Sequence, residues 1–115
     1  MSYLFEVDGM IALVYPVLMS SGNGIQHVHL VVSGRVQMVG FRFFALNAAE
    51  AYGITGFVRN LPNGDVEIAA SGKAADLKRF AAAVKQGPPS SSVHHVCEDW
   101  NRKAGEAFKS FTIRW

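Results

Sequence analysis

The 115-residue sequence predicts an α+β fold, in which two helices cover one face of an antiparallel sheet. Residues 27–33 alternate between apolar and mostly polar side chains, as in a strand with one buried face. Residues 43–52 are rich in alanine and contain no Gly or Pro, which favours a helix. An Asn-Gly pair at 63–64 separates two short apolar segments, a typical hairpin signal.

The first expected strand lies in HVHLVVSG, residues 27–34, where Val28, Leu30 and Val32 would share the buried face. The first expected helix covers Phe43–Tyr52 and ends before Gly53, because glycine is the usual residue just past a helix C-terminus. The residues between these two elements therefore form a connecting loop.

A hairpin is expected next. Its strands are GFVRN, residues 56–60, and VEIAASG, residues 66–72. The intervening LPNGD contains the Pro and Asn-Gly that tight turns favour. On the second strand Val66, Ile68 and Ala70 fall on one face, so we expect all three to be buried.

A second helix is expected over residues 74–86, because four apolar residues recur at the spacing of one helical face and Gly87-Pro88-Pro89 would end it. These four are Leu77, Phe80, Ala81 and Val84. Residues 92–100 and 108–115 read as two further strands. The order β-α-β-β-α-β with an extra C-terminal strand predicts a ferredoxin-like sandwich, with two helices on one face of an antiparallel sheet.

Residues 1–24 differ in composition from the rest, and we expect an N-terminal extension or packing arm ahead of a domain at 25–115. Their apolar run, 11–19, is shorter than the roughly 20 residues that span a bilayer, and acidic residues precede it, unlike in a secretory signal. We therefore expect a cytoplasmic protein with no membrane partner. An arm could pair between chains, so a monomer and a weak homo-oligomer stay open, as does a natural start at Met19.

Charge and cysteine content argue against several partners. The net charge is +2, and the eleven Lys and Arg residues are scattered rather than clustered as in a nucleic-acid-binding patch, so no nucleic-acid partner is expected. Cys97 is the one cysteine of the sequence and supplies neither a disulfide nor metal-site spacing. A metal site built on His27 and His29 would need histidines to converge across strands, so no metal is expected.

The loop GRVQMVGFR, residues 34–42, carries the functional signal. A glycine-bounded turn before a helix leaves several backbone N–H groups pointing into one concavity, where the helix dipole favours an anion such as phosphate. Arg42 at the helix start can bind two oxygens of the same phosphate. No Gly-Lys-Ser/Thr follows, so the loop is not the usual nucleotide-binding one.

Four segments resemble the acylphosphatases in order and spacing: VSGRVQMVGFR at 32–42, GITGFVRNLPNGDVEIAASG at 53–72, LKRF at 77–80 and QGPP at 86–89. The resemblance covers about residues 27–115. It implies the ferredoxin-like fold and hydrolysis of the carboxyl–phosphate bond of small acyl phosphates, which releases inorganic phosphate without metal or cofactor.

The resemblance also implies roles for individual residues. The catalytic arginine and asparagine of the family match Arg42 and Asn60. Asn60 would orient the attacking water. The carboxylate leaving group needs little protonation, so no strong general acid is required. No carboxylate would act as a general base, and the substrate phosphate itself would accept the proton of the water. The phosphoryl oxygens would be bound by Arg42 and by the backbone N–H groups of Val36, Gln37, Met38, Val39 and Gly40.

Other interpretations stay open. A non-catalytic regulatory module of the same fold could recognise a phosphate or carbamoyl phosphate. RNA-binding domains share the element order, but they carry stacking aromatics on the third strand, where VEIAASG has none. Without the resemblance, Asn60 could also be only the residue that starts the turn at 61–65.

Met38 is the one departure from the loop motif of the family, which typically has glycine at this position. Glycine permits left-handed backbone angles and a close approach to a ligand. Because the flanking motif is intact, we expect that residue 38 needs no left-handed backbone and that the Met38 side chain projects outward, over the mouth of the site.

Overall fold

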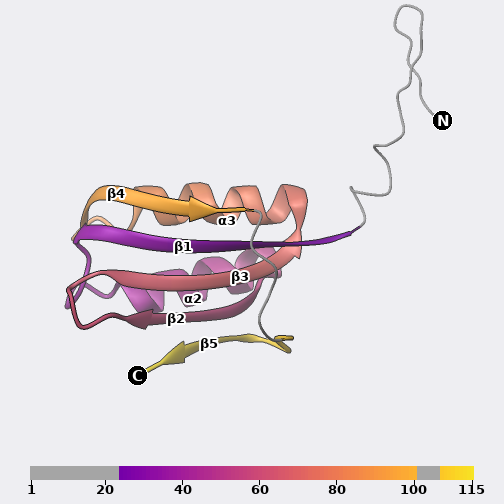
Figure 1. Ribbon diagram of the computed structural model, residues 1–115, viewed down its shortest axis with the longest axis horizontal. Helices are drawn as coiled ribbons and strands as arrows, with labels where there is room; N and C mark the ends of the chain where they lie inside the picture. The colour runs from indigo at the N-terminus through magenta and orange to yellow at the C-terminus, as the bar shows by residue number, and fades with distance from the viewer. Residues whose placement is uncertain (1–23, 101–106) are drawn as a thin grey trace, which may run out of the picture.

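The structure is a computed structural model that describes residues 24–100 and 107–115. The expected arm over residues 1–24 lies, apart from Gly24, outside the described residues. The described elements, in chain order, are β1 (Ile25–Arg35), α2 (Phe41–Tyr52), β2 (Thr55–Asn60), β3 (Val66–Lys73), α3 (Ala74–Gln86), β4 (Ser92–Asp99) and β5 (Phe111–Arg114). This order confirms the expected β-α-β-β-α-β plan with an additional strand (Figure 1).

The strands form one five-stranded sheet in the order β4-β1-β3-β2-β5. The first four pair antiparallel, as expected, but β5 pairs parallel to β2, so the sheet is mixed rather than wholly antiparallel. The reason lies in the strand directions. β4 and β3 both run antiparallel to β1, and β2 runs antiparallel to β3. The last residue of β4 therefore lies at the same edge of the sheet as the first residue of β2. A strand that starts at this edge and pairs with β2 is parallel to β2.

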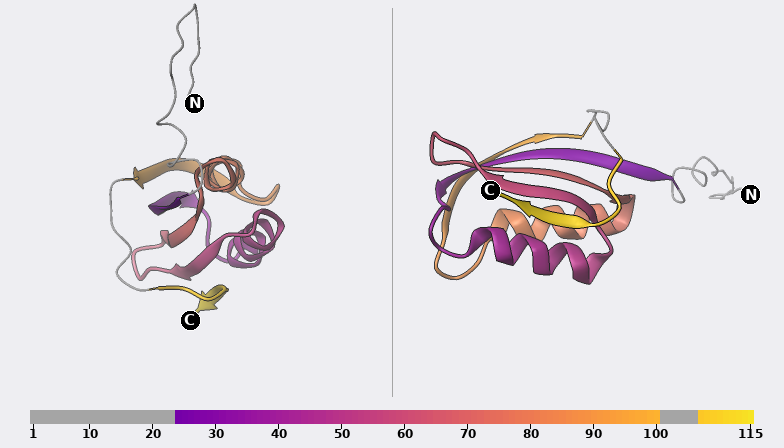
Figure 2. Two further views of the ribbon diagram at one scale, coloured as in Figure 1. Left: turned by 90° about the vertical axis from the view of Figure 1, so that its right-hand side faces the viewer. Right: turned by 90° about the horizontal axis from the view of Figure 1, so that it is seen from below.

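Both helices lie on the same face of the sheet (Figures 1 and 2). The apolar faces predicted for β1, β3 and α3 are buried, and together with residues of α2 they form one core. Its members include Val28, Leu30, Val32, Phe41, Ala45, Ala49, Val66, Ile68, Ala70, Leu77, Phe80, Ala81 and Val84.

Helix α2 begins at Phe41, earlier than the expected Phe43. Gly40 is its N-cap, and the Gly40 carbonyl accepts the first helical hydrogen bond from the Phe44 N–H at 3.0 Å. The Phe41 side chain is 2% exposed, so burial fixes the first helical residue in the core. Arg42 consequently lies within the first turn of the helix.

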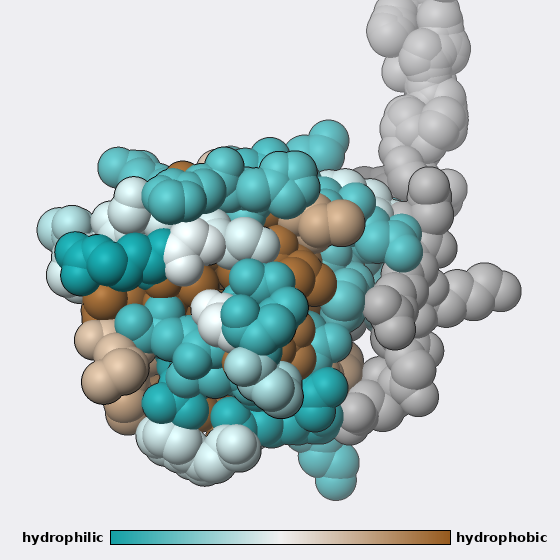
Figure 3. Space-filling model, turned by 60° about the vertical axis from the view of Figure 1, so that its left-hand side comes forward, coloured by the Kyte–Doolittle hydropathy of each residue, from teal (hydrophilic) through white to brown (hydrophobic). Residues whose placement is uncertain are grey.

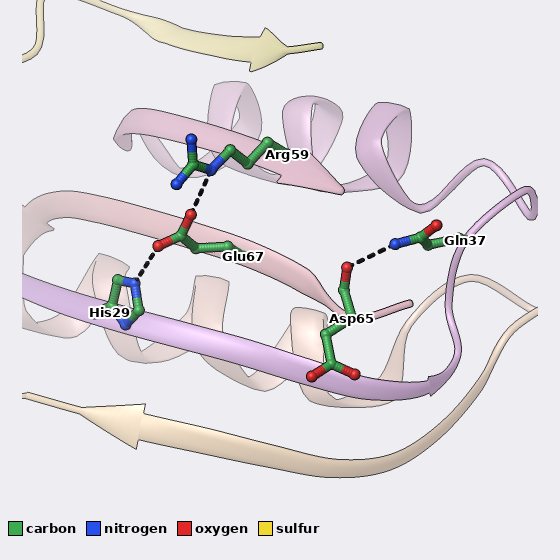
Figure 4. A network of polar contacts seen from close by, with 5 residues as sticks. All are labelled: His29, Gln37, Arg59, Asp65 and Glu67. Atoms are coloured by element: carbon green, nitrogen blue, oxygen red, sulfur yellow. Dashed lines mark hydrogen bonds and ion pairs between the residues drawn. The ribbon is translucent and has the colours of Figure 1, made fainter. Parts of the chain in front are cut away.

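The opposite face of the sheet carries a polar network at its centre. Nε2 of His29 lies 2.7 Å from one carboxylate oxygen of Glu67, and Arg59 Nε donates to the other oxygen (Figure 4). Burial raises the pKa of Glu67, but the hydrogen bonds and charges of His29 and Arg59 outweigh it and lower the pKa below its ordinary value.

Figure 3, which brings the left-hand side of Figure 1 forward, shows hydrophobic surface interrupted by hydrophilic residues.

Candidate active site

The candidate site begins where β1 leaves the sheet. Gly34 has φ +129°, and the pairing of β1 with β4 shifts register between Ser33 and Gly34. A Cβ atom at residue 34 would collide with the Ser92 carbonyl oxygen. Glycine therefore allows β1 to stay paired with β4 up to the start of the loop.

The backbone at Met38 corrects an expectation from the sequence. Met38 has φ +63°, which lies in the left-handed region, and it is the one non-glycine residue with positive φ in the described part of the chain. The expectation that residue 38 needs no left-handed backbone is therefore wrong. Its side chain is 100% exposed and projects outward, as expected. The strain of such a residue is about 1–2 kcal/mol.

The side chain of Gln37 ties the loop to the hairpin turn that follows Asn60. Its Nε2 donates to the backbone carbonyls of Leu61 and Asp65, each at 2.8 Å (Figure 4 shows the second bond). The other side of the loop is held by Ser90, whose hydroxyl donates to the Val39 carbonyl at 2.9 Å. We call these two hydrogen bonds from Gln37 to Leu61 and Asp65 the Gln37 clamp. The sequence suggested only a backbone contribution from Gln37, because no short-range pattern indicates a contact with residues this distant in the chain.

The loop and the end of β2 enclose one hollow of about 160 Å³. Arg42 and Asn60 both line it, so the structure brings together the two residues that the sequence proposes as catalytic. The full lining is Val36, Met38, Gly40, Phe41, Arg42, Phe43 and Asn60. Gln37 and Val39 were expected beside the phosphate but do not line the hollow, and Phe41 and Phe43 were not foreseen as part of it.

Asn60 has an unusual hydrogen-bonding state. Its Oδ1 atom is buried and has no hydrogen-bond partner among the described residues. Leaving a buried acceptor unpaired costs about 1–3 kcal/mol, and most buried polar atoms are hydrogen-bonded to protein or to water. An O–H donor, such as a water in the hollow, would satisfy it.

Arg42 presents its guanidinium group in a defined orientation. Its Cζ lies 4.1 Å from the centre of the Trp115 ring, in a cation–π contact. Among the described residues no carboxylate forms an ion pair with Arg42. A guanidinium has five N–H donors, and the contact of its carbon with one ring does not use all of them, so Arg42 can still donate to an anion.

The strand register explains how Trp115 reaches the site. Arg59 of β2 is aligned with Arg114 of β5 in the parallel pair. The next residues of the two strands, Asn60 and Trp115, therefore emerge at the same end of the sheet. Sequence patterns alone do not give the pairing partner or direction of β5, so the contribution of Trp115 was not foreseen.

The histidines of the sheet make polar contacts of their own. Nδ1 of His27 lies 2.6 Å from the Ser71 hydroxyl, and His29 is paired with Glu67. Among the described residues no group of three His, Cys, Asp or Glu side chains is arranged to hold a metal ion. None of the helices in the described ranges is long and apolar enough to cross a membrane.

The family model and similar known proteins indicate the same family. The family model for acylphosphatase matches residues 28–113. An acylphosphatase of Actinobacillus pleuropneumoniae is 41% identical over 90 residues, which are 78% of this chain and 99% of that protein. An acylphosphatase of Archaeoglobus fulgidus is also 41% identical, over 76% of this chain and 97% of that protein.

Solved structures agree with this result. The acylphosphatase of Bacillus subtilis superimposes with a TM-score of 0.74 and 36% identity, over 80% of this chain and all of the other. A full-length HypF structure, in its phosphate- and nucleotide-bound form, matches with a TM-score of 0.70 and 29% identity. That match covers 80% of this chain but 12% of the larger protein, so the similarity there is confined to one part of it.

Proposed function

The chain belongs to the acylphosphatase family of hydrolases, and on that premise we propose that it cleaves the carboxyl–phosphate bond of small acyl phosphates at the hollow between the 34–42 loop and β2. The products are a carboxylate and inorganic phosphate. The observation that supports this site most strongly is that Arg42 and Asn60, from separate elements, line one hollow.

The N-terminal end of α2 supplies the phosphate cradle. Gly40 caps the helix without a side-chain hydrogen bond, and the first turn contains no acidic residue, so helix N–H groups remain for an anion. Backbone N–H groups of residues 36–40 and the edge of the Arg42 guanidinium hold the phosphoryl oxygens in this proposal. Their positive potential stabilises the charge that these oxygens carry in the transition state.

Asn60 positions the nucleophile. Its unpaired Oδ1 accepts a hydrogen bond from a water, which directs a lone pair of that water toward phosphorus, opposite the leaving carboxylate. A bond forms between the water oxygen and phosphorus while the bond from phosphorus to the acyl oxygen breaks. The proton of the water moves to a phosphoryl oxygen, and the acyl group leaves as a carboxylate.

Phosphate release from acetyl phosphate and benzoyl phosphate, measured in EDTA, tests this assignment. We expect Arg42→Ala and Asn60→Ala each to lower kcat/KM by roughly 10²–10³-fold, as for other groups that stabilise a transition state. Arg79→Ala and Asn47→Ala are the matched controls, because both side chains are on helix surfaces away from the hollow. Full activity in Arg42→Ala or Asn60→Ala would refute the mechanism.

The similarity to part of HypF supports a second candidate, a non-catalytic module that recognises phosphate or carbamoyl phosphate. The same assay separates the two. Binding of carbamoyl phosphate without release of inorganic phosphate from any acyl phosphate would favour the module, and turnover would exclude it as the sole function.

The organisation of the chain is part of the proposal. Residues 25–115 act as the catalytic domain of a cytoplasmic monomer or weak homo-oligomer, and residues 1–24 are an extension that catalysis does not need. No nucleic-acid partner is involved. A chain that lacks residues 1–24 should retain turnover, and sedimentation of both forms would show whether the extension mediates association.

A further inference from the structure

Exposed apolar side chains gather at the mouth of the hollow. Within the described residues, the large hydrophobic side chains that are exposed are Ile25, Met38, Phe43 and Trp115. Met38 and Phe43 line the hollow, and Trp115 stacks on Arg42, which also lines it. Ile25 is the exception, since it lies at the start of β1, whereas the loop follows the end of that strand.

The exposure of these side chains has a cost that folding does not explain. Met38 is 100%, Trp115 85% and Phe43 56% exposed, so they contribute little to the core. Met38 also occupies a left-handed backbone position that glycine would adopt without strain. Strain and exposed apolar surface that persist together at a site are typical of a binding function.

The charges around the hollow restrict what the apolar side chains can bind. Arg42 is the one charged side chain in the described lining of the hollow. In the proposed mechanism it is occupied by phosphoryl oxygens. A charged acyl group would therefore meet no remaining counter-ion in that lining, whereas an apolar group would meet a thioether and aromatic rings.

We propose that Met38, Phe43 and Trp115 form an apolar rim that binds the acyl group, and that the substrates are acyl phosphates with an apolar, particularly an aromatic, acyl group. This inference rests on the proposed function. A phosphate held by the loop has its acyl substituent attached through one oxygen, so the substituent leaves the cradle at the mouth, where these side chains lie. The flexible Met38 adapts to the shape of the group, and the ring of Phe43 stacks against an aromatic one.

The test compares two substrates in variants of the full chain. We expect Phe43→Ser to lower the ratio of kcat/KM for benzoyl phosphate to that for acetyl phosphate by about fivefold, the order expected for an open apolar contact. Met38→Ser should lower the same ratio by a similar factor. Ile25→Ser, which removes an apolar side chain that is about as exposed as Phe43 but lies elsewhere, should leave the ratio unchanged. An unchanged ratio in both rim variants would overturn the proposal while acyl-phosphate hydrolysis stands.

A binding measurement keeps the two proposals separate. Phenylphosphonate and methylphosphonate carry a P–C bond in place of the acyl–oxygen–phosphorus linkage and are not hydrolysed, so their dissociation constants report the rim without the chemical step. We expect phenylphosphonate to bind more tightly to the unmodified chain, and Phe43→Ser to reduce that preference by about fivefold. If no acyl phosphate is hydrolysed, the proposed function fails. The preference between the two phosphonates then still shows whether the rim binds an apolar group. Equal binding of the two phosphonates, or binding of neither, would overturn the rim.

Discussion

The guanidinium carbon of Arg42 lies 4.1 Å from the centre of the Trp115 ring. This stack joins the first turn of α2 to the residue that follows β5, two parts of the chain that are distant in sequence. An arginine on a helix surface otherwise samples many rotamers, and fixing it before the substrate arrives reduces the entropy lost on binding.

Replacing Trp115 should therefore weaken substrate binding more than it slows turnover. We expect Trp115→Ala to raise the KM for acetyl phosphate and the inhibition constant of inorganic phosphate by about threefold, since an exposed cation–π contact contributes about 0.5–1 kcal/mol. Trp115→Phe keeps an aromatic face and should restore most of the loss. Identical kinetics for the Ala and Phe variants would show that the stack does not position Arg42.

The left-handed backbone at Met38 predicts a stabilising substitution. Met38→Gly should raise the free energy of unfolding by about 1 kcal/mol, because relief of the strain exceeds the extra chain entropy that glycine loses on folding. Urea denaturation at constant m-value measures this change. Val39→Gly, in the same loop but not at a positive φ, is the control and should be destabilising.

Turnover gives a second readout for the same substitution. We expect acetyl phosphate turnover of Met38→Gly to stay within about tenfold of the unmodified chain, equivalent to about 1.4 kcal/mol of barrier. A much larger gain would mean that methionine distorts the cradle.

The Gln37 clamp predicts a combined loss of stability and activity. Gln37→Leu removes two hydrogen bonds, to Leu61 and Asp65, and should lower the free energy of unfolding by about 1–3 kcal/mol. Because the clamp sets the loop relative to the end of β2, kcat/KM should fall by about tenfold even under conditions where the variant is folded. Gln86→Leu, at the exposed end of α3, is the control. Loss of stability without loss of activity would separate the clamp from catalysis.

Glu67 predicts a pH dependence of stability. Its pKa in the folded protein lies below the ordinary value of 4.5, so the unfolded chain takes up the proton first as pH falls. The stabilisation from Glu67 is therefore complete above about pH 4.5 and is lost as pH falls from there through the folded pKa.

Glu67→Gln should flatten the decrease in unfolding free energy below that pH, relative to the unmodified chain. Denaturant titrations at about one-unit intervals between pH 3 and pH 7 measure the unfolding free energy at each pH. Glu50→Gln, an exposed carboxylate on α2, controls for the loss of one acidic group. An unchanged slope in Glu67→Gln would show that the His29 and Arg59 contacts do not persist in solution.

The helices and strands could be predicted because their signals are local. Alternation along β1, the apolar spacing in α3 and the Asn-Gly turn each act within a few residues. Arg42 was indicated by the loop and by its place at the helix start, whereas the proposed role of Asn60 came from the resemblance to the acylphosphatases. The clamp made by Gln37 and the contact of Trp115 depend instead on pairing between distant segments, which no local pattern encodes.

The backbone of Met38 was mispredicted for a different reason. Intrinsic preference disfavours a left-handed methionine, and the surrounding loop overrides it. The early start of α2 has the same kind of cause, because burial of Phe41 in the core extends the helix beyond the alanine-rich segment.

The sheet order also has a kinetic consequence. The pairs β1 with β4 and β2 with β5 join segments that are far apart in the sequence, and such non-local topologies fold slowly because loop closure precedes their contacts. The hollow is bounded by residues whose positions depend on these pairs. After dilution from denaturant, hydrolytic activity should therefore return at the rate of the slowest spectroscopic refolding phase. The recovery of activity then measures how fast the native sheet is completed.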